Sequence, residues 1–186
     1  MDEAEVLERI QAALDGEPER FAPLVHAYSP GLFNLAAKMT GSRDRATEIV
    51  QETFFRAYRD LGRVDGRSRF QSWLFGICVN VCYDDGKRRR RAAMQGQEPL
   101  ESLPGAAEAA DASLAARQEE ARMRRCLERL PETLRAAVLL RFQEDLALGD
   151  VAKSLGIGLS AAKMRIARGL DQLRGCMEAG PMEGRG

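Results

Sequence analysis

The sequence predicts an all-α protein: two small helical domains joined by a flexible acidic linker. Apolar residues recur every three or four positions along most of the chain, and no β-type alternation of useful length is present. Between residues 92 and 116 the composition shifts to Ala, Gly, Pro, Gln, Glu and Ser, which is typical of a linker. The last third contains two short apolar-periodic segments on either side of a glycine-containing turn. We therefore expect two separate helical units.

The first 91 residues predict four helices, at 4–14, 21–39, 43–61 and 70–91. The second helix is expected to bend or break at Pro30-Gly31, because proline removes a helix hydrogen bond. Ser42 is suited to cap the third helix, and Asp44 near its first turn complements the helix dipole. A polar loop at 62–68 separates the third helix from the fourth.

Residues 130–173 predict a helix followed by a helix-turn-helix. Gly156 and Gly158 form the turn between two amphipathic segments. The second segment has apolar residues at the spacing i, i+4, i+7, i+11, which places Ala162, Ile166, Gly169 and Leu173 on one buried stripe. Its other side begins with donors and positive charge, as suits a helix that enters the DNA major groove. The residues that face outward there are Ser160, Ala161, Lys163, Met164, Arg165 and Arg168.

These patterns divide the chain into a first domain at 1–91, a linker at 92–116, a second domain at 117–178 and a tail at 179–186. The charge distribution agrees with this division. The 28 basic and 28 acidic residues cancel over the whole chain. However, residues 20–91 hold fourteen basic against seven acidic residues, and residues 122–186 hold twelve against eight. Basic segments are where phosphate contacts come from, although chance clustering of solvated charge is an alternative.

Several classes of protein are disfavoured. No run approaches the ~20 apolar residues that span a membrane, and the acidic N-terminus, MDEAEVLERI, lacks a secretory-signal pattern, so we expect a cytoplasmic protein. The four cysteines, Cys78, Cys82, Cys126 and Cys176, form no C-x-x-C pair, which favours core packing over metal or redox roles. The sequence shows no nucleophile–base constellation, Gly-rich phosphate loop or metal-ligand spacing, so we expect neither enzymatic activity nor a cofactor.

The predicted helix at 43–61 has two faces. One is apolar and is expected to pack on its own domain: Ala46, Val50, Phe54, Ala57 and Leu61. A separate face is polar and acidic with one large aromatic: Glu48, Gln51, Glu52, Phe55 and Arg59. Such a face can dock the helix of another protein. Spacing alone nevertheless favours an ordinary solvated face with a partly buried Phe55.

A second candidate surface surrounds Trp73. Arg69, Trp73, Asn80 and Lys87 lie near one side of the predicted helix at 70–91, close to the basic run that ends it. An aromatic ring and an amide among cations can hold unstacked bases. For Trp73 alone, simple core packing is favoured, because Trp73 is the single tryptophan of the chain and lies in an apolar run. The basic run favours a nucleic-acid or electrostatic role.

Two blocks of the sequence resemble those of a known family. The string 44-DRATEIVQETFFRAYRDLGRVDGRSRFQSWLFGICVNVCYDDGKRRRR-91 resembles region 2, the promoter-melting domain, of extracytoplasmic-function (ECF) sigma factors of bacterial RNA polymerase, in the sigma-70 family. The strings 130-LPETLRAAVLLRF-142 and 151-VAKSLGIGLSAAKMRIARGL-170 resemble their region 4. A lone helix-turn-helix is weak support. The pairing of the two blocks in this order, with a short linker between them, makes the resemblance specific.

The resemblance implies a role for each candidate surface. The face of Glu48, Gln51, Glu52 and Phe55 falls where the family grips the clamp helices of the polymerase β′ subunit. The loop at 62–68 falls where the family captures a flipped base of the −10 element, together with Arg69, Phe70, Trp73 and Asn80, and Lys87 and Arg88 extend this surface. The residues expected on the helix that reads the −35 element are Ser160, Ala161, Lys163, Met164, Arg165 and Arg168.

The resemblance therefore implies a sigma factor that directs core polymerase to specific promoters by binding −35 and melting −10. The implied partners are core RNA polymerase, through its β′ clamp helices and β flap, promoter DNA and an anti-sigma factor that could hold the protein at the membrane. No small-molecule substrate is expected. Two alternatives remain at this stage: a stand-alone helix-turn-helix regulator, which leaves residues 44–91 unexplained, and an adaptor whose basic faces bind acidic partners.

Overall fold

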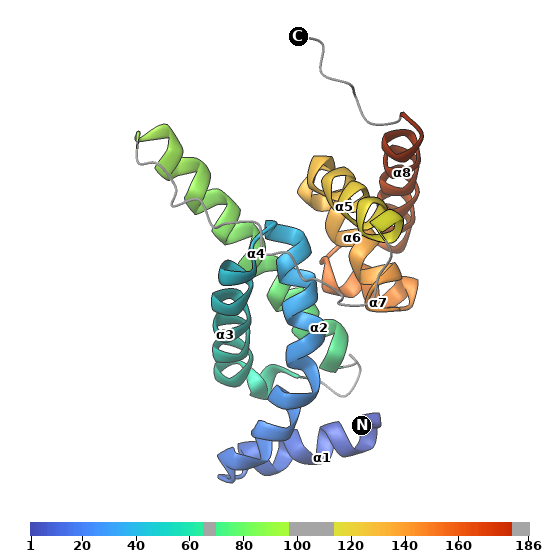
Figure 1. The fold of residues 1–186 in the computed structure, drawn as a ribbon. Helices are drawn as coiled ribbons and strands as arrows, with labels where there is room; N and C mark the ends of the chain where they lie inside the picture. Colours follow the sequence, from blue (N-terminus) through green and yellow to red (C-terminus); the bar gives the residue numbers. More distant parts are fainter. Residues whose placement is uncertain (65–69, 97–113, 180–186) are drawn as a thin grey trace.

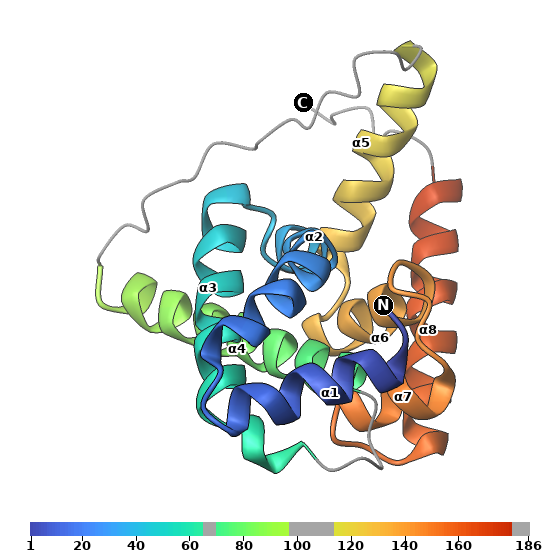
Figure 2. The same cartoon turned by 90° about the horizontal axis from the view of Figure 1, so that it is seen from below.

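The computed structural model describes residues 1–64, 70–96 and 114–179. Throughout these residues the regular structure is helical, which confirms the predicted fold class. Figures 1 and 2 show two helical bundles side by side, the first made of α1–α4 and the second of α5–α8. The α-helices are α1 (Glu3–Leu14), α2 (Ala22–Thr40), α3 (Arg43–Arg59), α4 (Phe70–Met94), α5 (Leu114–Arg129), α6 (Glu132–Phe142), α7 (Leu148–Ser154) and α8 (Leu159–Glu178).

The corner between α2 and α3 forms as the sequence predicts. The α2 helix ends at Gly41, whose φ of 70° is a left-handed conformation that glycine adopts readily. Ser42 caps α3, because its hydroxyl accepts a hydrogen bond from the Arg45 backbone N–H at 3.3 Å. Of the predicted bend or break at Pro30, the break is wrong, since α2 is continuous through it. Leu24 and Leu32, on either side of the proline, are both fully buried, so core packing continues across this point.

The first bundle buries one face of α3 and most of the first half of α4. The buried face of α3 includes Ala46 and Ala57, as predicted, together with Ile49 and Thr53. Val50 is only partly buried, so the apolar face is rotated slightly from the predicted one. Ile49 and Thr53 lie outside the predicted stripe, so the sequence identifies this face but not its centre.

The second bundle is organised around α8. Its buried residues are the four of the predicted stripe: Ala162, Ile166, Gly169 and Leu173. Gly169 is required by close packing, because a Cβ there would lie 2.5 Å from Val138 Cγ2 of α6. The stripe therefore fixes which side of α8 turns toward solvent.

Some element boundaries differ from the predicted ones. The α4 helix continues through Met94, beyond the predicted end at residue 91, and α5 begins at Leu114, within the predicted linker. Most of that linker lies outside the described residues. Among the described helices, none combines the length and apolar character needed to span a bilayer.

The two bundles pack against each other through α4 and α7. The Ser154 hydroxyl of α7 donates to the Ser72 carbonyl of α4 at 2.7 Å, and both groups are buried. Gly76 allows this contact, because a Cβ at that position would lie 2.8 Å from the Ser154 carbonyl oxygen. This close backbone approach holds the helix-turn-helix against the first bundle.

Candidate polymerase and nucleic-acid interfaces

The outer face of α3 presents an exposed aromatic ring among polar side chains. Phe55 is 65% exposed, so it is a surface residue and not part of the core. Glu48 and Gln51 are exposed beside it, whereas Glu52 is half-buried and accepts a hydrogen bond from Arg56 Nε at 2.7 Å. A large exposed ring surrounded by polar groups is a feature of protein docking sites.

A shallow cleft adjoins this face. It has a volume of about 430 Å³ and lies between α3 and α4, where Glu48, Glu52 and Asp84 contribute carboxylates. Arg56 bridges the two helices, because its guanidinium also bonds Asp84 at 3.1 Å. Glu48 and Glu52 therefore belong both to the face that carries Phe55 and to the lining of this cleft.

The residues around Trp73 are divided between core and surface. Phe70 is 3% exposed and packs against Tyr28 and Trp73, with ring centroids 5.4 and 5.8 Å away. Trp73 itself is half-buried, so the structure makes it neither a full core residue nor a free platform. Asn80 is exposed farther along α4, whereas Arg69 lies outside the described residues. Only part of the predicted −10 surface is therefore accessible in this conformation.

The basic end of α4 is partly neutralised. Lys87 and Arg88 are exposed, but Arg88 pairs with buried Asp85 at 2.8 Å. Arg90 pairs with Glu132 of α6 at 2.7 Å, across the two bundles. The run therefore contributes to the fold as well as offering positive charge to a phosphate backbone.

Helix α8, the predicted recognition helix, carries its predicted polar face outward. Ser160, Lys163 and Arg168 are exposed, and Met164 is 48% exposed. Ala161 and Arg165 are half-buried. These side chains begin at the N-terminal end of the helix, where backbone N–H groups and positive charge favour an anion.

Arg165 lies close enough to the first bundle for its charge to act there. Its charge acts on the phenol of Tyr83 in α4, whose pKa is raised to about 12 by burial, with Arg165 opposing that rise. The buried Tyr83 hydroxyl has no hydrogen-bond partner among the described residues. In this conformation a residue predicted to contact −35 DNA is half-buried and acts electrostatically on the domain predicted to contact −10 DNA.

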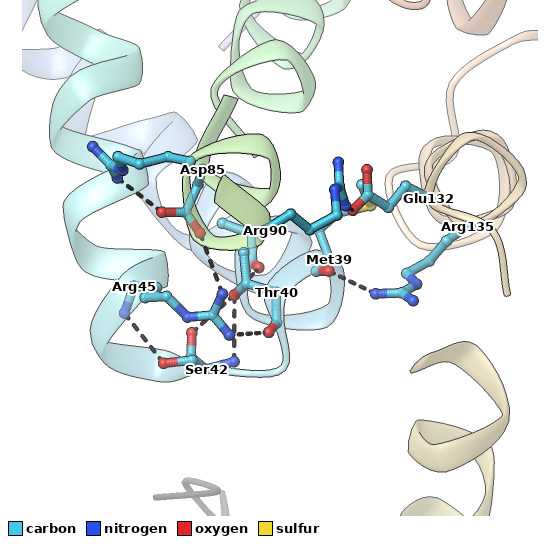
Figure 3. Close-up of polar contacts among 10 residues, drawn as sticks. Met39, Thr40, Ser42, Arg45, Asp85, Arg90, Glu132 and Arg135 are labelled. Carbon is cyan, nitrogen blue, oxygen red and sulfur yellow. Dashed lines mark hydrogen bonds and ion pairs between the residues drawn. The ribbon is translucent and has the colours of Figure 1, made fainter. Parts of the chain in front are cut away.

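A buried arginine, not anticipated from the sequence, joins the bundles (Figure 3). Arg135 of α6 donates from Nη1 to the Met39 carbonyl of α2 at 2.6 Å. Its Nη2 donates to the carbonyls of Glu128 and, at 3.0 Å, Leu130. Burial lowers the pKa of this guanidinium. Nothing in the helical periodicity could reveal the role of Arg135, because its acceptors are backbone atoms from two separate segments.

The cysteines divide into two kinds. Cys78 and Cys82 are buried and free, in agreement with the predicted core packing. Cys126 and Cys176 instead form a disulfide between α5 and α8, so the prediction was wrong for this pair. Their Cα atoms lie 5.8 Å apart although 50 residues separate them along the chain. The packing of α5 on α8 creates this proximity, and local spacing cannot show it.

One helical bundle thus has a polar, acidic face with an exposed aromatic ring, and the other has a helix-turn-helix whose last helix turns cationic side chains toward solvent. This combination is that of a DNA-binding transcription protein, and the comparisons with known families identify which one. The chain matches the families described as sigma-70 region 2, over residues 24–92, and sigma-70 region 4, over residues 120–173. It is 30% identical over 171 residues to the ECF RNA polymerase sigma-E factor of Salmonella typhimurium strain LT2, which covers 88% of this chain and 87% of that protein. The chain belongs to the ECF sigma factors.

Other relatives agree with this assignment. The ECF RNA polymerase sigma factor SigW of Bacillus subtilis is 26% identical over 178 residues, covering 91% of this chain and 95% of that protein. The fold is similar to that of CnrH, solved in complex with the cytosolic domain of CnrY, with a TM-score of 0.72, 24% identity and coverage of 96% and 99% of the two chains. It also resembles RpoE in complex with the anti-sigma factor NepR from Bartonella quintana, with a TM-score of 0.71, 23% identity and coverage of 86% and 98%.

Proposed function

We propose that this ECF sigma factor directs core RNA polymerase to promoters through three surfaces on its two bundles. The observation that carries the proposal is the geometry of α8, which buries Ala162, Ile166, Gly169 and Leu173 and leaves its cationic side outward. In this proposal Ser160, Ala161, Lys163, Met164, Arg165 and Arg168 contact the −35 duplex. The cations bind phosphates, and Ala161 and Met164 can contact thymine methyl groups.

The first bundle supplies the other two surfaces. Glu48, Gln51, Glu52 and Phe55 bind the clamp helices of the β′ subunit, a proposal supported by the exposure of the Phe55 ring. Trp73 and Asn80 receive an unstacked base of the −10 element, with Lys87 and Arg88 following the backbone. Arg69 belongs to this proposed surface, and Phe70 supports Trp73 from the core. The protein acts in the cytoplasm and contributes no catalytic residue of its own.

An anti-sigma protein is the proposed regulator. One structure of similar fold is RpoE in complex with the anti-sigma factor NepR, and another is CnrH in complex with the cytosolic domain of CnrY. The exposed Phe55 offers such a protein the same ring that core polymerase would use. Anti-sigma binding at this face would then compete directly with polymerase binding.

Run-off transcription on a pool of genomic promoter fragments tests the function. Purified core polymerase would be assayed with and without the protein. Discrete transcripts that appear only with the protein are expected. Their absence, together with sequence-specific duplex binding by the protein alone, would favour a stand-alone regulator instead.

Replacing Arg165 and Arg168 by Ala is expected to weaken duplex binding and to flatten its salt dependence. Each phosphate contact that is lost should lower the slope of log K against log salt by about 0.9, because fewer counterions are released. Fluorescence anisotropy over a salt series measures this slope. Arg174→Ala is a matched control, since that arginine lies near the other end of α8 and pairs with Asp171. An unchanged slope with altered base preference would contradict phosphate contacts by Arg165 and Arg168.

A further inference from the structure

We propose that Cys126 and Cys176 form a reversible thiol–disulfide site whose oxidation favours the packed arrangement of the two bundles. The inference rests on the proposed function, because RNA polymerase works beside the chromosome, in a compartment where thiols are kept reduced. Disulfides in such a compartment are usually transient and serve catalysis or redox sensing. The other two cysteines, Cys78 and Cys82, are buried and unpaired, so a distinct property belongs to the α5–α8 pair.

The α5 helix is held to its own bundle by few contacts besides the disulfide. Its only buried residues are Cys126 and Leu127, and residues 114–120 are all exposed. Close to the bridge, the Arg122 guanidinium donates a hydrogen bond to the Met177 carbonyl, next to Cys176 on α8. Figure 2 shows α5 extending away from the body of the molecule. The bridge is therefore a large part of what attaches α5 to α8.

The other side of α5 contacts the first bundle. A pocket of about 370 Å³ lies between α5 and the α2–α3 corner, with Lys38, Arg43 and Met123 among its lining residues. A Cβ at Gly41 would lie 3.3 Å from the Glu128 carboxylate, so the end of α5 fits closely on this corner. The α5 helix thus bridges the bundles, with α8 on one side and α2 on the other.

The proposed function requires the bundles to separate. The −10 and −35 elements lie about 25 base pairs apart, or about 85 Å at the rise of the duplex. A compact chain of 186 residues has a radius of gyration of only about 16 Å. The packed arrangement therefore cannot place one bundle on each element, and in this arrangement Arg165 is half-buried.

The redox state of the bridge affects this separation through α5. In the reduced protein, α5 loses its contacts with α2 when the bundles part and is then free to fray. That freedom adds conformational entropy to the separated state. The disulfide keeps α5 ordered in both states, so the separated state loses that entropy and the packed state becomes more populated. Oxidation is thus expected to lower promoter-directed activity.

The chemistry is a two-electron exchange with a small disulfide. Cys176 is half-buried and Cys126 is 3% exposed, so Cys176 is the accessible attacking group. Its thiolate attacks the small disulfide, which forms a mixed disulfide and releases one small thiol. The Cys126 thiolate then attacks the Cys176 sulfur and releases the second small thiol. The two protons that the cysteines lose end on these thiols, and a dithiol reductant reverses the sequence.

The experiment compares the full chain after treatment with dithiothreitol or with glutathione disulfide, each removed before assay. Alkylation of the denatured protein with a maleimide of known mass should count four thiols in the reduced protein and two in the oxidised one. In run-off transcription, the oxidised protein should direct about fivefold less transcript than the reduced one, within the usual range of coupling between sites. Cys126→Ser and Cys176→Ser should match the reduced protein after either treatment. Cys82→Ala is the matched control and should keep the wild-type response.

A second readout needs no polymerase. Small-angle scattering should give a larger radius of gyration for the reduced chain than for the oxidised one, and Cys126→Ser should remove that difference. Equal radii, or a thiol count of four after oxidation, would overturn the proposal. So would transcription that is unchanged or increased by oxidation. Failure of the reduced protein to direct any transcript would instead count against the proposed function, and the scattering result would still decide the redox proposal.

Discussion

Replacing Phe55 by Ala is expected to weaken binding to core polymerase about 30-fold, which corresponds to a hot-spot contribution of about 2 kcal/mol. The ring is 65% exposed in the free protein, so its removal leaves no cavity in the bundle. Aromatic anchors of this kind dominate the binding energy of protein interfaces because they fill a pocket on the partner. Binding of labelled protein to purified core enzyme, followed by fluorescence, measures the change.

Leu14→Ala provides a control for Phe55→Ala. Leu14 is also exposed, at 48%, but it lies at the end of α1, away from the α3 face. This variant should bind polymerase like the wild type. Both variants should keep the wild-type thermal midpoint and the affinity of the recognition helix for duplex DNA. An unfolded Phe55→Ala protein, or one with unchanged affinity for polymerase, would contradict the docking role.

Replacing Arg135 by Met is expected to lower the free energy of unfolding by about 3 kcal/mol. A hydrogen bond to a charged donor contributes about 1.5–3 kcal/mol, and buried carbonyls left without a donor add a further cost. The acceptors here belong to Met39, Glu128 and Leu130, so the loss affects both the bundle interface and the turn between α5 and α6. Denaturant unfolding monitored by circular dichroism gives the value. Exposed Arg125, replaced in the same way, should change stability by less than about 0.5 kcal/mol.

Gly76→Ala tests the bundle interface without affecting the α5–α6 turn, whereas loss of Arg135 affects both. In an isolated helix, alanine is more stable than glycine by about 1 kcal/mol. At this position, however, the alanine Cβ would lie 2.8 Å from the Ser154 carbonyl oxygen. The variant should therefore part the bundles while each keeps its own fold, which sedimentation velocity would detect as a more extended particle. A compact Gly76→Ala protein would show that the α4–α7 contact is not required for packing.

Helical periodicity predicted those parts of the fold that depend on neighbouring residues. All four residues of the buried stripe on α8 are predicted correctly. Four apolar positions on one side of a helix predict burial of that side, and this does not depend on which element covers it. The cap at Ser42 was equally local. For Phe55, the spacing placed the ring on a separate face but favoured partial burial, and the structure instead leaves it largely exposed.

The contacts that join the bundles could not be predicted in this way. Ser72 and Ser154 meet across 82 residues, and the two bridged cysteines across 50. Both contacts depend on how whole helices stack, which periodicity within one helix does not specify. Arg135 reads as an ordinary charged residue in a short helix, because its partners are main-chain carbonyls with no side-chain signature.

The position of Asp85 bears on how the basic end of α4 can exchange partners. Its carboxylate is only 6% exposed and holds two cations at once, Arg45 at 3.2 Å and Arg88 at 2.8 Å. If Arg88 is transferred to a phosphate, Asp85 still has Arg45 as its counter-ion, so no lone charge is left buried, which would be strongly destabilising. Arg88 can therefore leave Asp85 to bind an incoming anion and return when the anion dissociates, while Asp85 stays paired with Arg45 throughout.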